Sequence, residues 1–422
     1  MMRPGNVSRA YLVSLIFCVG ALLVCHAESD LQGAALLNAK GVEAYKQKNW
    51  EEALTHFLGA YRLAPNQSVV RRNLCNTYQA IADELMRSSK FSEAAEQLEV
   101  AISIDTENPS PLIQLGACYL RLGYIQDAIY RLEEAVELAP QNVDGRDLLG
   151  DAYYREGDLS SAIEQWSWVE QVQPTRKGLA EKLEKARREA TVEQTYRQRP
   201  SAHFQFSYAP GTQGTDLARA TTILERAYRE IGRRLGGAYP PAPILVKVYT
   251  ARDFSQATLL GEHVGAVYDG TIRLPMMDKN GVILDDAELR RRLFHEYTHV
   301  VVRHIAGDNV PWWLNEGLAE VFSDEITQEE VALLQSAFQQ GKAFPLQSLE
   351  EHQLNALRVD DLQLAYVQSH ATVRYLWTRF GQGSLVRFLN LLAAGTTPED
   401  ALRQIYRRSY ATLDKEMAGQ YR

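Results

Sequence analysis

Residues 289–306 read LRRRLFHEYTHVVVRHIA. Apolar residues recur at helical spacing along this stretch, which predicts a helix packed firmly into a core. His295 and His299 stand four positions apart, so both imidazoles lie on one helix face and can reach the same metal ion. Glu296 stands beside them, where it can poise a water molecule on that metal. Because the chain has nine histidines, such a match arises by chance with a likelihood of about one in a hundred, and it requires support elsewhere.

The segments that flank the motif supply this support. An aspartate pair precedes the helix as an N-cap signal and Gly307 follows it, which predicts a helix over Asp286–Ala306. A catalytic zinc needs three protein ligands and one open position for water. A second helix is predicted over residues 312–320, which read WWLNEGLAE, and in it Glu316 stands 17 residues after His299 (316 − 299).

The pairing of HEYTH with Asn-Glu-Gly-x-Ala resembles the gluzincin metallopeptidases, which use a glutamate as the third zinc ligand. The resemblance implies that zinc is the cofactor, bound by His295, His299 and Glu316, and that Glu296 is the general base. It also implies that Glu320, one turn after Glu316, hydrogen-bonds a zinc histidine and fixes its orientation. The alternative for Glu320 is an ordinary surface acid.

A further matching segment lies at residues 365–376, which read AYVQSHATVRYL. Relatives of aminopeptidase N place an oxyanion-stabilising tyrosine nine residues before a Tyr-Leu pair, and Tyr366 stands nine residues before Tyr375. The resemblance therefore implies that Tyr366 donates a hydrogen bond to the oxyanion. His370 is the rival, because thermolysin uses a histidine in this role. In a third interpretation both residues only pack the helix.

The remainder of residues 200–422 predicts an α+β domain. Alternating or apolar runs predict short strands before the motif, and helices follow to the C-terminus; the predicted strands are 203–208, 244–249, 264–268 and 271–275, with a helix over 215–235. With its HExxH helix, EGLA segment and Ala-Tyr-x-x-Ser helix in this order, the domain resembles the bacterial peptidase MA-like group. The fold class that we predict is an all-α repeat superhelix followed by this α+β gluzincin-like domain.

One of the predicted strands, 264–268, indicates which class of peptide substrate the domain cleaves. Aminopeptidases of this clan carry Gly-x-Met-Glu-Asn, whose glutamate holds the free amine of the substrate. The comparable residues here are Gly265, Ala266, Val267, Tyr268 and Asp269, without a glutamate. The departure favours an endopeptidase, and residues 265–268 are predicted to pair with an extended substrate backbone.

Residues 34–176 repeat with a period of 34, as four units. Small residues recur where two helices must approach closely, and a proline stands near the end of each unit. This pattern resembles the tetratricopeptide repeat; the second unit, 68–108, has about seven extra residues, which we place between its helices. The resemblance implies a concave face that recruits a peptide, protein substrate or partner, the alternative being a structural spacer. The charged residues 177–199 are predicted to form a solvated capping helix that ends at Pro200.

The first 27 residues predict a cleaved secretory signal. Arg3 and Arg9 precede an apolar run, Tyr11–Val24, that is short for a membrane span of roughly 20 residues. We therefore expect export to the periplasm or the extracellular space, with no membrane span after cleavage. A lipid anchor on Cys25 is disfavoured by Val24.

Composition sets outer limits on function. The 422 residues suggest two or three domains, and the net charge of −8 argues against a dedicated nucleic-acid binder. Cys75 and Cys118 are the cysteines outside the signal, and their apolar neighbours favour two buried free thiols over a disulfide.

Together these features predict an exported zinc metallopeptidase with a substrate- or partner-binding repeat array. Two alternatives stay open. In one, the chain is a non-catalytic interaction scaffold with a relic metallopeptidase domain; in the other, it hydrolyses a non-peptide amide.

Overall fold

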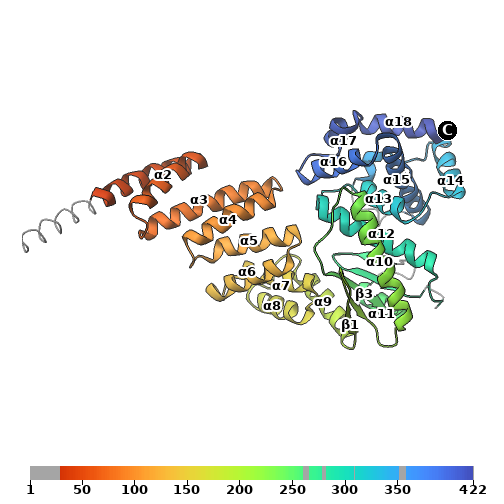
Figure 1. Cartoon of the computed structure of the whole chain (residues 1–422), viewed down its shortest axis with the longest axis horizontal. Coiled ribbons are helices and arrows are strands. Elements are labelled where there is room, and N and C mark those ends of the chain that lie inside the picture. The colour runs from red at the N-terminus through yellow and green to blue at the C-terminus, as the bar shows by residue number, and fades with distance from the viewer. Residues whose placement is uncertain (1–28, 260–265, 278–281, 308, 351–357, 422) are drawn as a thin grey trace, which may run out of the picture. The chain divides into compact units, whose positions relative to one another are not determined.

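The structure is a computed structural model that describes residues 29–259, 266–277, 282–307, 309–350 and 358–421 (Figure 1). The predicted signal, 1–27, and Gly265 lie outside these residues. The described chain divides into two compact units. The first comprises residues up to Cys118 together with Glu133–Gln141, and the second comprises Tyr119–Leu132 and the residues from Asn142 onward.

The first unit consists of paired helices. A helix over residues 29–46 is followed by α2 (Trp50–Leu63), α3 (Ser68–Arg87) and α4 (Phe91–Ile104). Fully buried alanines on α2 and α4 let neighbouring helices approach closely. Cys75 and Cys118 are free and buried here, as predicted, and burial raises the pKa of their thiols to about 11 and about 12.

The predicted insertion between the helices of the second repeat is wrong. The α3 helix has 20 residues and α2 has 14, and only residues 88–90 separate α3 from α4. The additional residues lengthen the helix because residues 82–87 include neither glycine nor proline, and most of them favour helix. By contrast, Gly157 in the last repeat adopts a φ of +88° and ends the corresponding helix after 14 residues.

Two further helices, α5 (Pro109–Leu122) and α6 (Ile125–Leu138), contribute residues to both units. In the second unit, α7 (Val143–Glu156) and α8 (Leu159–Val172) form the last pair, and α9 (Leu179–Glu193) packs on α8 through Trp166 and Leu183. The repeat array with its final helix is thus confirmed as all-α.

The predicted capping helix is too long. It ends at Glu193, and strand β1 (Arg197–Pro200) follows instead of a helix to Arg199. This strand pairs antiparallel with β2 (Phe204–Tyr208), and at the edge of a sheet proline is tolerated.

Among the described residues, five strands form one mixed sheet of order β1-β2-β3-β5-β4. The three inner strands, β2, β3 (Ile244–Tyr249) and β5 (Ile272–Pro275), are parallel, and β4 (Val267–Tyr268) pairs antiparallel with β5. The connections include α10 (Gly214–Arg234) and α11 (Ala251–Thr258). Alternate side chains such as Phe206, Val246 and Leu274 point into the main apolar core, which they share with α10 and α12.

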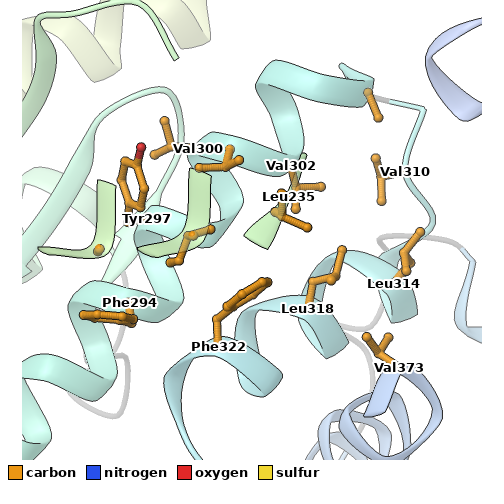
Figure 2. Close-up of a cluster of buried hydrophobic side chains, with 14 of the residues drawn as sticks. Leu235, Phe294, Tyr297, Val300, Val302, Val310, Leu314, Leu318, Phe322 and Val373 are labelled. Atoms are coloured by element: carbon orange, nitrogen blue, oxygen red, sulfur yellow. The ribbon is translucent and has the colours of Figure 1, made fainter. Parts of the chain in front are cut away.

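The helices after the sheet carry the motifs. They are α12 (Asp286–Ala306), α13 (Trp312–Ser323), α14 (Gln328–Gln339), the 3-10 turn η1 (Leu346–Leu349), α15 (Val359–Phe380), α16 (Gln382–Ala393), α17 (Pro398–Tyr406) and α18 (Tyr410–Tyr421). Figure 2 shows apolar side chains of α12 and α13, including Val300, Val302, Leu314 and Leu318, gathered in one buried cluster with Val373 of α15. This shared core fixes the three helices relative to one another, and the predicted α+β domain is confirmed.

No helix within the described ranges is long and apolar enough to cross a membrane.

Candidate metal centre

Helix α12 begins and ends where the sequence predicts. Asp285 caps its first turn by accepting a hydrogen bond from the backbone N–H of Glu288 at 2.8 Å. Leu289, Leu293 and Val301 on the core face are fully buried. A helix held this firmly gives His295 and His299, on its other face, fixed positions.

Helix α13 brings Glu316 to the two histidines. Its Oε2 atom lies 3.4 Å from His295 Nε2 and 3.6 Å from His299 Nε2. Ligand atoms about 2.1 Å from a tetrahedrally coordinated zinc stand about 3.4 Å apart, so these two separations fit two edges of such a site. The three candidate ligand atoms all lie within 4.8 Å of one another.

The close packing of α13 on α15 depends on Gly317. A Cβ atom at this position would lie 2.5 Å from the carbonyl oxygen of Ser369 and 2.5 Å from Val373 Cγ2. Only a residue without a side chain allows this approach. Gly317 directly follows Glu316, so it also sets the depth at which this carboxylate stands.

Glu320 orients the imidazole of His295 through the Nδ1 atom of the ring. Its Nδ1 lies 3.3 Å from Glu320 Oε1, which leaves Nε2 directed at Glu316. This is where the sequence comparison places a histidine-orienting acid. His299 Nδ1 is buried and has no hydrogen-bond partner among the described residues. The other ring nitrogen, Nε2, lies near the carboxylate of Glu316, where both groups can bind one metal ion.

The site concentrates negative charge. Burial alone lowers the pKa of His295, but hydrogen bonds to Glu316 and Glu320 outweigh it and raise this pKa well above its ordinary value. Burial raises the pKa of Glu316, and the nearby histidines outweigh that effect and lower it. The arrangement therefore favours a cation among these groups, which a divalent metal ion supplies.

Glu296 is 6% exposed and directly follows His295, within the helix turn that separates the two histidines. Burial is the main cause that raises the pKa of its carboxyl, and the nearby histidines oppose it. A carboxylate with a raised pKa accepts a proton more readily near neutral pH, as a general base must.

The two candidates for oxyanion stabilisation differ in their surroundings. Tyr366 packs edge-on against Trp312, with ring centroids 5.0 Å apart. Burial raises the pKa of its phenol, and the carboxylates of Glu316, Glu320 and Glu296 add to this effect.

His370 lies one turn further along α15 and is 3% exposed, with Nε2 lacking a partner among the described residues. Burial lowers its pKa, and the carboxylates of Glu320 and Glu330 oppose this effect. Glu320 of the candidate metal centre acts on both residues, and the oxyanion role of Tyr366 stays a prediction.

The predicted substrate strand forms an edge of the sheet. Val267 and Tyr268 constitute β4, paired only with Arg273 and Ile272 of β5, while Ala266 precedes the strand. Since β4 is last in the strand order, its other side has no strand partner among the described residues. Gly265 lies outside them.

A second polar cluster was not foreseen from the sequence. We define the ion-pair cluster as Glu189 and Glu193 of α9, Lys247 of β3 and Arg273 of β5. Lys247 Nζ lies 2.7 Å from Glu193 Oε2, and Arg273 Nη2 lies 3.1 Å from Glu189 Oε2. Glu189 and Arg273 are 1% exposed, so the prediction that the charges of 177–199 form a solvated face is wrong for this side of α9. The one signal in the sequence is a basic residue inside each of two apolar strands.

Family comparison identifies both parts of the chain. The Peptidase MA superfamily model matches residues 233–420, and a tetratricopeptide repeat model matches residues 113–166. The chain therefore carries a Peptidase MA superfamily domain and tetratricopeptide repeats, a combination that fits protein binding and peptidase function. No curated protein matches the chain.

Several solved structures are similar to the repeat part. MamA protein shares 19% identity over 37% of this chain and 81% of its own, with a TM-score of 0.30. A thermophilic TPR protein of Thermus thermophilus shares 18% over 36% and 98%, with a TM-score of 0.24. The first TPR of Spaghetti, bound to an HSP90 peptide, shares 22% over 30% and 95%, also with a TM-score of 0.24.

Proposed function

We propose that this protein is an exported zinc-dependent metallopeptidase that cleaves internal peptide bonds. The observation that carries the proposal is the spacing of His295 Nε2, His299 Nε2 and Glu316 Oε2, which fits tetrahedral zinc, with buried Glu296 beside them. Two imidazoles and one carboxylate suit zinc and leave a coordination position for water.

The residues divide the chemistry among them. When bound, zinc supplies a Lewis acid that polarises the peptide carbonyl and lowers the pKa of water. Glu296 takes a proton from the attacking water and delivers it to the leaving amine. Tyr366 donates a hydrogen bond from its phenol to the developing oxyanion. Glu320 accepts a hydrogen bond from His295 Nδ1 and so keeps Nε2 turned to the site.

The edge strand gives the substrate a place to bind. An extended peptide adds to the open side of β4, with main-chain hydrogen bonds to residues 265–268. The lack of a glutamate in this strand favours internal cleavage, because an aminopeptidase needs an acid for the free amine. The repeats recruit the substrate or a partner, and the signal at residues 1–27 directs export.

The test uses the purified chain, its zinc content and a pool of quenched fluorescent peptides. We expect about one zinc per chain, cleavage that a chelator abolishes, and a loss of about 10³-fold or more in Glu296→Gln with zinc retained. Glu329→Gln, at an exposed position of α14, is the matched control and keeps wild-type activity. A zinc-loaded wild type that cleaves no peptide in the pool would favour the interaction scaffold instead.

A further inference from the structure

The turn between β4 and β5 is held by helix α9. Lys185 of α9 has its Nζ 2.6 Å from Asp269 Oδ2, and Arg273 Nε of β5 lies 3.0 Å from Asp269 Oδ1. Asp269 directly follows β4, and the next residue, Gly270, adopts a φ of +109° that lets the chain reverse there. The carboxylate that begins this turn is therefore fixed by a lysine 84 positions away in sequence.

The same contacts continue into the last repeat. Arg273, which is 1% exposed, donates a hydrogen bond to the hydroxyl of Tyr154 on α7 at 3.2 Å and lies 3.1 Å from Glu189 Oε2. The hydroxyl of Tyr154 donates to Glu189 Oε1 at 2.8 Å, and Lys185 Nζ lies 5.5 Å from the centroid of the tyrosine ring. Lys185 and Glu189 stand four positions apart, on one face of α9. Helices α7 and α9 and the turn thus share one polar network within the second unit.

Strand β4 gains from this network because the strand is short. It comprises only Val267 and Tyr268, and a ladder of this length stabilises a hairpin little. Tyr268 packs against the main apolar core, and Asp269 ties the following turn to α9. Helix α12, which carries the two histidines, contacts β4. The place of the open edge beside α12 therefore depends in part on α9.

We propose that Lys185 is a positioning residue for the substrate: through Asp269 it holds the β4–β5 turn, and with it the open edge on which an extended peptide pairs. The inference rests on the proposed peptidase function and gives α9 and the last repeat a part in substrate binding. Lys185 is the residue to change, because its loss leaves Asp269 the contact with Arg273 and leaves the ion-pair cluster intact.

The first arm of the test needs no substrate and measures hydrogen exchange in the full chain. We expect Lys185→Gln to speed the exchange of the backbone N–H groups of residues 267–273 about fivefold, the size expected for one partly exposed ion pair, and to leave α12 unchanged. Lys185→Arg keeps the wild-type rate, because a guanidinium also reaches Asp269. Lys177→Gln, at an exposed position ahead of α9, is the matched control.

The second arm measures kinetics on the quenched fluorescent peptides that the wild type cleaves. We expect Lys185→Gln to raise KM about fivefold with kcat and zinc content little changed, because the change weakens the hold on the peptide and leaves the metal centre in place. Lys185→Arg restores KM. A fall in kcat with KM unchanged would mean that Lys185 acts on the chemical step, which overturns the inference.

The third arm measures binding without cleavage. A random peptide pool, acetylated and amidated at its ends, is applied to Glu296→Gln protein, and we expect about fivefold less peptide to be retained when Lys185→Gln is added. If retention falls in this way while the wild type cleaves nothing, only the peptidase proposal fails. Unchanged exchange at residues 267–273, unchanged retention, or no retention by Glu296→Gln protein overturns the role of Lys185. Thermal unfolding of each variant shows that weaker binding is not lost structure.

Discussion

The second unit buries two polar clusters, and they differ in how completely their charges are paired. In the ion-pair cluster, two acids face two bases, with contacts of 2.7 and 3.1 Å. The candidate metal centre has three acids, Glu296, Glu316 and Glu320, and two histidines. Glu316 and Glu320 lie 3.3 to 3.6 Å from the histidines. In the ion-pair cluster, the acids are paired with bases. The candidate metal centre has more acids than bases, with the charge and spacing of a cation-binding site. Burial alone therefore does not mark a functional cluster, but an unmatched charge does.

The largest expected effect is a loss of stability when the ion-pair cluster is broken, with the candidate metal centre left intact. Arg273→Met leaves Glu189 as a buried charge without its closest base, and we expect it to lower the free energy of unfolding by about 3–5 kcal/mol. Zinc content per folded protein stays unchanged. Chemical denaturation and metal analysis provide the measurements, with Arg229→Gln as the exposed control.

A double variant sharpens this result. Adding Glu189→Gln to Arg273→Met removes the orphaned charge, so part of the lost stability returns. If the double variant is less stable than the sum of the single variants, the ion-pair cluster does not act as a paired unit.

The next largest effect is expected on catalysis and not on stability. Tyr366→Phe removes the phenol hydroxyl but keeps the ring that packs on Trp312. We expect kcat to fall about a hundredfold, with KM and the unfolding midpoint little changed, because the hydrogen bond forms chiefly in the transition state. A larger loss in His370→Gln than in Tyr366→Phe would assign the oxyanion role to His370.

A smaller effect tests the orientation of His295. Glu320→Gln keeps the shape of the side chain but weakens its hold on Nδ1, and zinc affinity should fall about tenfold. Competition with a chromophoric chelator measures the change. An unchanged affinity would make Glu320 an ordinary partly buried acid.

The smallest effect is a pH dependence at the turn between β4 and β5. Burial raises the pKa of Asp269, but Arg273 and Lys185 outweigh this and lower it below its ordinary value of 3.8. A carboxyl with a depressed folded-state pKa stabilises the fold above its unfolded-state pKa, and this contribution is lost as the pH falls through the folded-state value. Asp269→Asn should therefore cost about 1 kcal/mol at pH 7, and the difference from the wild type should shrink below about pH 4. A constant difference down to pH 2 would contradict this ion pair.

Local signals in the sequence predicted the elements that carry the site. The bounds of α12 and β3 match the prediction, because a cap, a terminal glycine or an apolar run marks each of them. The proximity of Glu316 to His295 and His299 followed from family resemblance, since the 17-residue spacing alone does not fix where α13 packs. The structural reason for that packing, the missing side chain of Gly317, is a contact with α15 and cannot be read from local sequence.

The errors arose where distant residues decide the structure. The helix α9 was extended to Arg199 because its charged residues favour helix, but pairing with β2 turns Arg197–Pro200 into a strand. Glu189 was placed on a solvated face because its partner Arg273 is 84 residues away in sequence. Both cases require knowledge of which surface covers the sheet, and that is a tertiary property.

The ion-pair cluster also limits how this protein can be divided or recombined. Sequence families separate repeats from peptidase, and Pro200 is a natural place to cut the gene. The cut would strip α9 from the sheet and leave Lys247 and Arg273 as buried cations without their acids. A peptidase fragment that begins at Pro200 should therefore be insoluble. Exchange of one repeat array for another, by recombination or in the laboratory, should succeed only when the junction lies ahead of Tyr119, so that all segments of the second unit, the last repeat and α9 included, are inherited together.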